Sequence, residues 1–117
     1  MEKIIDNKKL IIKSATMNSC LELFSYVARK SATIDLKIED VLKNINENIF
    51  KIIFTCLSEK ECFDLILKIS SNSIFDNQKI DIKLFEEEEY KEYFFQVGFE
   101  ILKYHFNVFF KKLIVLK

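Results

Sequence analysis

The sequence predicts a mainly α fold: a small, single-domain helical fold of about four helices spanning residues 1–117. One or two short β-strands are expected near the N-terminus and around residues 80–84. Half of the residues are apolar, which is enough for a core, and the length suits one domain. The chain has a single glycine and no proline, so few residues interrupt helices. Apolar residues recur every three or four positions in several long segments, the spacing of amphipathic helices.

The N-terminal third predicts a strand followed by a helix. Residues 8–15 are aliphatic and bounded by charge, as in a short strand. Thr16 or Asn18 is a candidate cap for the helix that follows. Residues 31–38 alternate apolar and polar side chains, which favours a second short strand or an extended linker. The apolar side of the first helix comprises Cys20, Leu21, Phe24, Val27 and Ala28.

The middle of the chain predicts a helical hairpin. Asp40 is placed to cap an amphipathic helix that continues to Leu57. Ser58 and Glu61 form an S-x-x-E capping box, which starts another helix immediately afterwards. We therefore expect the chain to bend near Ser58. The apolar positions of the second helix are Cys62, Leu65, Ile66 and Ile69.

The last third predicts a loop, a weak strand and one long helix. Residues 70–79 are rich in Ser, Asn and Asp, as loops are, and residues 79–85 alternate as in a strand. The carboxylates of residues 86–89 suit the positive end of a helix dipole, and Lys111 and Lys112 suit the negative end. We therefore expect the last helix to run from about residue 87 to residue 113.

This last helix has two apolar stripes, whereas an ordinary surface helix has one. Either the helix is central and packed on both sides, or one stripe faces the core and the other faces a partner. The first stripe resembles a packed seam, and the second is rich in phenylalanine, which suits binding surfaces. The first comprises Tyr90, Phe94, Val97, Ile101, Tyr104 and Val108. The second comprises Phe95, Phe99, Leu102, Phe106, Phe109 and Leu113.

The residue types that carry catalysis or bind cofactors do not form a recognisable pattern. His105 is the only histidine, so no histidine-based metal site or catalytic triad can be built. The three cysteines, Cys20, Cys56 and Cys62, lack zinc-site spacing. Four consecutive carboxylates on a helix point in different directions, and one glycine excludes a glycine-rich phosphate loop. We expect no catalytic residues, no cofactor and no metal, and hence no enzyme.

Charge and hydropathy bear on partners and location. The net charge is zero, so nothing favours binding to nucleic acid. Acidic residues gather in 59–100 and only basic ones occur in 101–117, which would allow pairing within or between molecules, or simply solvated faces. The N-terminus lacks the apolar region of a secretory signal, and no stretch is apolar enough to span a membrane. We expect a cytoplasmic protein with reduced, buried cysteines.

The segment from about 74 to 113 resembles the tail assembly chaperones of long-tailed bacteriophages and prophages. The matching stretches are KIDIKLFEEEEYKEYFF (79–95) and EILKYHFNVFFKKL (100–113). The aliphatic N-terminal strand, the helix after it and IDLK (34–37) fit the opening of that family. Val108 stands where the family usually has proline, and His105 where it usually has asparagine. Positions that match the family's motif are Phe85, Tyr90, Tyr93, Leu102, Lys103, Phe109, Phe110 and Leu113.

The resemblance implies a protein that binds the tape measure protein non-covalently in the host bacterial cytoplasm and keeps it soluble during tail assembly. It gives the second stripe a purpose as a client-binding or homo-oligomer surface. The alternative is a small phage- or host-encoded regulator or inhibitor, such as an anti-defence protein, that acts by binding another protein. The expected partner-binding residues are Phe95, Phe99, Phe106, Phe109 and Phe110, with Lys111 and Lys112 as a polar rim.

Overall fold

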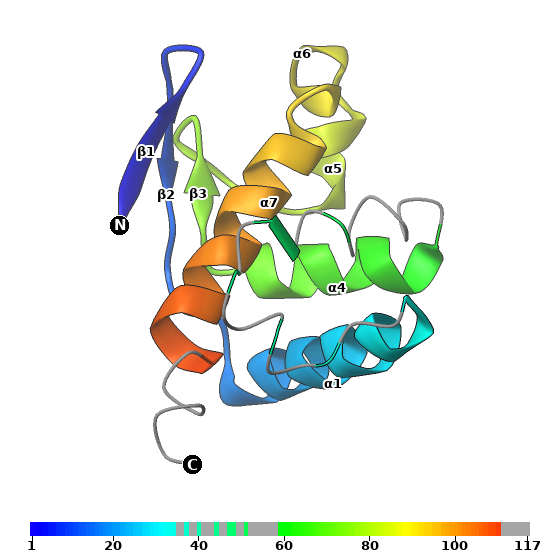
Figure 1. Cartoon of the computed structure of the whole chain (residues 1–117). Coiled ribbons are helices and arrows are strands. Elements are labelled where there is room, and N and C mark those ends of the chain that lie inside the picture. Colours follow the sequence, from blue (N-terminus) through cyan, green and yellow to red (C-terminus); the bar gives the residue numbers. More distant parts are fainter. Residues whose placement is uncertain are drawn as a thin grey trace.

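The computed structural model describes residues 1–34, 37, 40, 44, 47, 48, 51 and 59–110. Within these residues, several helices lie beside a four-stranded antiparallel sheet of order β1-β2-β3-β4. Figure 1 shows the strands on one side of the molecule, with α7 running obliquely past them and past α4 and α1. The expected helical character is confirmed. The sheet is larger than predicted, so the fold combines helices and a sheet and is not clearly mainly α.

The first hairpin joins β1 (Glu2–Ile5) to β2 (Lys8–Ile11). Its two turn residues, Asp6 and Asn7, have positive φ angles of 48° and 68°. Two successive left-handed residues define a type I′ turn, which matches the twist of the flanking strands. Asp and Asn tolerate this conformation better than most residues. The predicted strand within 8–15 is therefore confirmed, and its partner strand β1 was not anticipated.

The second hairpin joins β3 (Ile74–Phe75) to β4 (Gln78–Lys79) through the same kind of turn. Asp76 and Asn77 have φ angles of 51° and 63°. Strand β3 pairs with β2 so that Phe75 lies opposite Leu10, and both side chains are fully buried. Residues 70–79 therefore contain a short β-hairpin, together with the residues that lead into it. The prediction of a loop was wrong for β3 and β4.

Helix α1 (Met17–Thr33) is capped by Thr16, one of the two candidates that the sequence offered, and Asn18 lies inside the helix. The Thr16 hydroxyl accepts a hydrogen bond from the Ser19 N–H at 3.2 Å, which satisfies one of the N–H groups left without a partner at a helix start. The helix continues to Thr33, so the strand predicted over 31–38 is wrong for its first residues. Residues 35, 36 and 38 of that prediction lie outside the described residues.

Only part of the predicted helical hairpin can be compared. The Asn44 N–H donates to the Asp40 carbonyl and the Asn48 N–H donates to the Asn44 carbonyl, which is α-helical spacing. Apart from Glu47 and Lys51, the other residues of the predicted helix lie outside the described residues, Cys56 among them, and so does Ser58 of the capping box. Helix α4 (Lys60–Ser70) follows Glu59. The apolar positions predicted for α4 are confirmed as buried: Cys62, Leu65, Ile66 and Ile69.

The C-terminal region contains more helical segments, and shorter ones, than the sequence predicted. Helix α5 (Ile82–Glu86) replaces the strand predicted around 80–84, because the Asp81 carboxylate caps it by accepting from the Leu84 N–H. The expected helix over 87–113 is also wrong as a single element. It consists of α6 (Glu88–Lys91), α7 (Phe94–His105) and a π-helical segment, η1 (Phe106–Phe110). Residues 111–113 lie outside the described residues.

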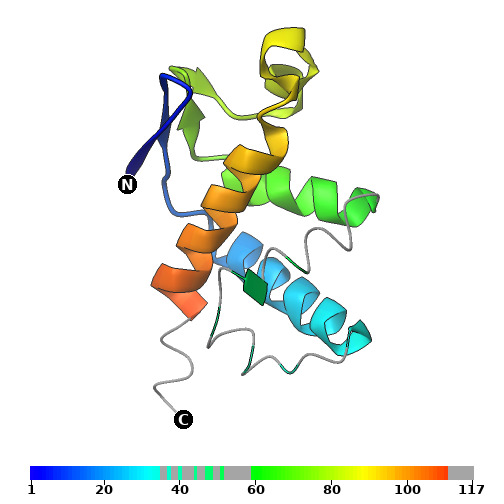
Figure 2. The same cartoon turned by 45° about the horizontal axis from the view of Figure 1, so that its top comes forward.

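Close packing of α7 on α4 depends on the single glycine. A Cβ atom built on Gly98 would lie 2.7 Å from the Cγ2 atom of Ile66 in α4, closer than side chains tolerate. On the sheet side, Lys3 of β1 forms an ion pair with Glu100 of α7. Figure 2 shows α7 with the hairpins on one side and α4 and α1 on the other. The helix therefore packs on two sides, but Phe95 of the second stripe remains 49% exposed, so neither of the two expected arrangements holds along its whole length.

Candidate functional site

Four phenylalanine rings from three helices form an aromatic cluster at the start of α7. Phe94 lies at its centre and is only 6% exposed. Its ring centroid is 4.7 Å from that of Phe63 in α4, 5.2 Å from that of Phe85 in α5 and 5.0 Å from that of Phe95. Stacked and edge-to-face contacts at these distances stabilise aromatic pairs beyond the area they bury. Within this cluster, the Phe95 ring packs edge-to-face against the buried ring of Phe94.

Phe95 and Phe99 form the part of the predicted surface that the structure brings together. They are one helical turn apart on α7. Phe95 is 49% exposed, and Phe99 is half-buried against the core. The Lys103 ammonium lies 5.0 Å from the centroid of the Phe99 ring, a cation–π contact. This pair presents an aromatic surface with a cation at its edge.

The remainder of the predicted surface is not brought together. Phe106 is fully buried, so the expectation that it lies on a partner-binding surface is wrong. Val108, expected in the packed seam, is instead 49% exposed. The second stripe enters the core before η1, because Leu102 of α7 is only 4% exposed and Phe106 follows it by one helical turn. The backbones of Phe109 and Phe110 form part of η1, and the role predicted for their side chains stays a prediction. The same holds for Lys111 and Lys112, which lie outside the described residues.

His105 joins the end of α7 to the segment before α1. Its Nδ1 lies 2.8 Å from the Ile101 carbonyl oxygen, and its Nε2 accepts from the Ala15 N–H at 2.9 Å. These contacts fix the neutral tautomer with the proton on Nδ1. Burial lowers the pKa of His105 below its usual value, although the bond to Ile101 opposes this. Both ring nitrogens thus bind the backbone, and neither faces a reactive group.

A cavity of about 170 Å³ lies beside His105 and includes Cys20 among its lining residues. A cysteine near a histidine suggests nucleophilic chemistry, which requires an imidazole nitrogen able to take the thiol proton. The Nε2 atom that would do so already accepts from the Ala15 N–H. Burial also raises the pKa of the Cys20 thiol, which disfavours the reactive thiolate. This geometry therefore favours a structural role for both residues.

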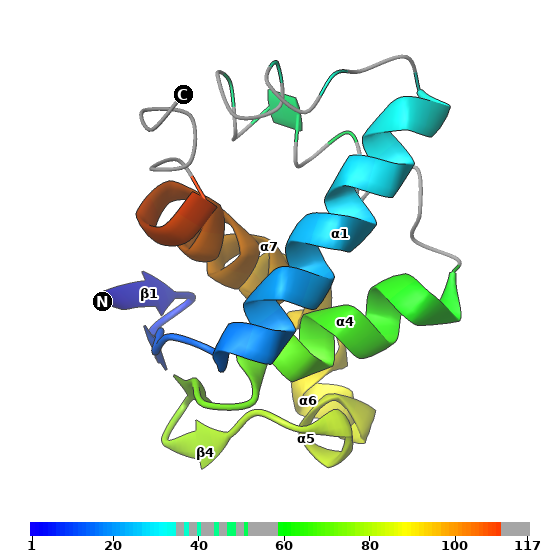
Figure 3. The same cartoon turned by 90° about the horizontal axis from the view of Figure 1, so that it is seen from below.

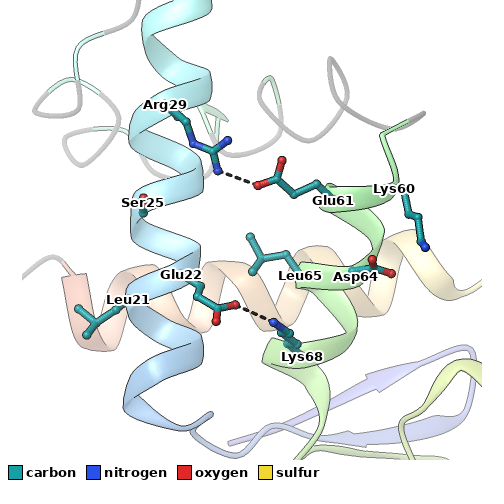
Figure 4. A pocket seen from close by; sticks show the side chains of 9 residues that line it. All are labelled: Leu21, Glu22, Ser25, Arg29, Lys60, Glu61, Asp64, Leu65 and Lys68. Atoms are coloured by element: carbon teal, nitrogen blue, oxygen red, sulfur yellow. Dashed lines mark hydrogen bonds and ion pairs between the residues drawn. The ribbon is translucent and has the colours of Figure 1, made fainter.

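A larger groove of about 690 Å³ lies between α1 and α4 and was not anticipated from the sequence. Figure 4 shows ion pairs across it, between Arg29 and Glu61 and between Glu22 and Lys68. Leu65 lies at its floor and is buried, whereas Leu21 at its edge is 54% exposed. The sequence did indicate that Leu21 belonged to α1, but it placed this side chain on the apolar side of that helix.

The described residues provide neither a cluster of metal ligands nor a membrane-spanning helix. Among the residues that the structure describes, no three or more His, Cys, Asp or Glu side chains are grouped to hold a metal ion. The carboxylates of residues 86–89 are all exposed and divided between α5, α6 and the residue that joins them. None of the helices in the described ranges combines the length and apolar character needed to cross a membrane.

Comparison with known proteins does not identify a family. No protein-family model, curated protein or solved structure matches this chain.

Proposed function

We propose that this protein is a bacteriophage tail assembly chaperone, which binds the tape measure protein non-covalently in the host bacterial cytoplasm and keeps it soluble during tail assembly. The resemblance of residues 74–113 to that family motivates the proposal. The observation that carries it is Phe95, a half-exposed ring that packs edge-to-face against the buried ring of Phe94. A client rich in apolar helical surface would pack against such a ring.

Phe95 has the properties of a binding hot spot. Aromatic residues dominate the energy of many interfaces because they bury a large area and lose little entropy on binding. The contact with Phe94 restricts the Phe95 ring before the client arrives, which lowers the entropic cost further. Phe99 extends the same surface by one turn, and Lys103 supplies a polar edge. The client-binding surface is thus narrower than the one predicted from the sequence.

Co-expression with the tape measure protein of the same phage tests the proposal. The tagged wild-type chaperone should retain the tape measure protein in the soluble fraction. Phe95→Ala should reduce the amount retained by about tenfold or more, as expected for a hot-spot residue. Val108→Ala is the matched control, because Val108 is also 49% exposed but has no part in the aromatic cluster.

Two results would contradict the proposal in different ways. If the folded wild-type protein retains no tape measure protein, the proposed client is wrong. Specific retention of one folded host protein in its place would favour the alternative, a small regulator or inhibitor. If Phe95→Ala folds and retains the tape measure protein as well as the wild type does, the client is right and the proposed surface is wrong.

A further inference from the structure

Six charged side chains line the groove between α1 and α4. Four of them form ion pairs across it, whereas Lys60 and Asp64 of α4 point away from α1 (Figure 4). The two helices run antiparallel, since Glu22 near the start of α1 pairs with Lys68 near the end of α4. Arg29, towards the end of α1, pairs with Glu61 at the start of α4. The N–O distances are 2.9 Å and 2.7 Å. Figure 3 shows the two helices close together near the start of α1 and diverging towards its end, and Figure 4 shows the ion pairs between them.

The signs of the four paired charges alternate in both directions. Along α1, the anion Glu22 is followed two turns later by the cation Arg29. Along α4 in the same direction, the cation Lys68 is followed by the anion Glu61. Each charge therefore has the opposite sign beside it across the groove and farther along its own helix. All four side chains remain 50–58% exposed, so they can contact another molecule while paired.

An alternating square of charges is complementary to itself. If a second copy is turned over about a two-fold axis in the plane of this face, each carboxylate meets a cation of the other copy. This holds for an axis along the groove and for one across it. Two-fold dimers use the same patch on both subunits, which requires this self-complementarity. We infer that the face formed by α1 and α4 is an interface between two copies of this chain.

The apolar side chains of the groove fit this inference. Leu21 is 54% exposed although it lines the groove, and burial against a second copy would remove its apolar surface from water. Charges at the border of an interface set the choice of partner and the register more than the affinity. The inference is independent of the proposed client, because Phe95 and Phe99 do not line this groove.

Charge-reversed variants of the full chain test the interface. Glu22→Lys with Glu61→Lys leaves only cations at the four positions, and Arg29→Glu with Lys68→Glu leaves only anions. Light scattering and sedimentation should show that the wild type dimerises at micromolar concentration. Each double variant alone should have a dissociation constant raised by about tenfold or more, because like charges then face each other. An equimolar mixture of the two should associate about as strongly as the wild type.

A matched control separates this face from general attraction between opposite net charges. Glu88→Lys with Glu89→Lys changes the net charge equally, but on exposed residues of α6. It keeps the groove, so it should dimerise by itself as the wild type does, and the anionic groove variant should not join these dimers. The inference is overturned if the wild type stays monomeric to about millimolar concentration, if the mixture of the two groove variants does not associate, or if the anionic groove variant binds the α6 variant as strongly as it binds the cationic groove variant. Should a double variant fail to fold by circular dichroism, Glu22→Lys and Lys68→Glu serve as the pair in the same comparison.

Discussion

The Tyr90 hydroxyl donates a hydrogen bond to the Asp76 carboxylate across 2.6 Å, which ties α6 to the turn of the second hairpin. Three residues later, the Tyr93 hydroxyl donates to the Asp6 carboxylate in the turn of the first hairpin at 3.0 Å. Each type I′ turn therefore has its first central residue bound to a tyrosine of the same short segment. The sheet is attached to the helices through these two bonds as well as through its buried face.

We predict that Tyr90→Phe destabilises the protein by removing the hydroxyl and keeping the ring. The Asp76 carboxylate would lose a donor, and the Gln78 amide, which donates to the Tyr90 oxygen at 2.9 Å, would lose its acceptor. Thermal unfolding should show a Tm lowered by several degrees. Lys83→Met is a suitable control, because Lys83 is exposed on α5 and its removal should leave the Tm nearly unchanged.

The same bond predicts a dependence on alkaline pH. The Asp76 carboxylate and burial raise the pKa of Tyr90 from 10.0 to about 12. A folded-state pKa above the unfolded one contributes stability below pH 10, and this contribution is lost as the pH rises towards 12. The difference in stability between wild type and Tyr90→Phe should therefore shrink across this range in denaturant titrations. A difference that stays constant from pH 9 to about pH 12 would show that the bond to Asp76 contributes little.

The burial of His105 predicts a loss of stability at acidic pH. Its folded-state pKa is lowered from 6.5 by burial, so below pH 6.5 the unfolded chain takes up a proton that the folded chain resists. Stability should fall as the pH drops below 6.5, and the decline from this residue should end once the folded imidazole is protonated. Protonated Nε2 could no longer accept from the Ala15 N–H. Chemical denaturation between pH 7.5 and about pH 5 measures the slope.

His105→Gln separates this titration from that of the carboxylates. Glutamine has no proton to gain in this range, so the variant should be less stable than the wild type at pH 7.5 and should lose less stability on acidification. Parallel slopes for the two proteins would mean that His105 titrates alike in the folded and unfolded chains.

The sequence predicted the elements whose signal is local and missed those fixed by tertiary contacts. Thr16 capped α1 as expected, and the apolar positions of α4 are buried, because caps and helical periodicity act within a few residues. The two hairpins carried a weaker local signal. Asp-Asn pairs at residues 6–7 and 76–77 stand where left-handed residues are needed, and the more familiar signal is Asn-Gly or Asp-Gly.

The candidate site was predicted only in part for a similar reason. Helical geometry placed Phe95, Phe99 and Phe106 on one stripe, but it could not show that tertiary contacts cover the end of that stripe, where Leu102 and Phe106 are buried. The bond between His105 and Ala15 holds the end of α7 against the start of α1, and Phe106 follows into the core. Such a contact across 90 residues of sequence leaves no periodic pattern, so the burial of Phe106 could not be read from the chain.

We predict that Gly98→Ala destabilises the protein although alanine is the better helix former. The new Cβ would lie 2.7 Å from Ile66 Cγ2, and overpacking of this kind costs about 1–3 kcal/mol. The gain in helix propensity is about 1 kcal/mol and offsets only part of this cost. Urea denaturation gives the net effect. Ile66→Ala removes the opposing methyl group, so the double variant should be more stable than the sum of the two single effects implies; simple additivity would contradict the contact.

The final prediction separates core from surface along one stripe of the C-terminal helix. Phe106 is fully buried, so Phe106→Ala should lower the free energy of unfolding by about 3–5 kcal/mol, a large share of what small domains have. Phe95 is half-exposed, so Phe95→Ala should cost only about 1 kcal/mol, mainly through its ring contact with Phe94. Guanidinium denaturation of the two variants beside the wild type measures both. Equal losses of unfolding free energy would mean that the two rings have equivalent surroundings, contrary to the structure. If Phe106→Ala is stable and Phe95→Ala is unfolded, the assignment of core and surface is reversed.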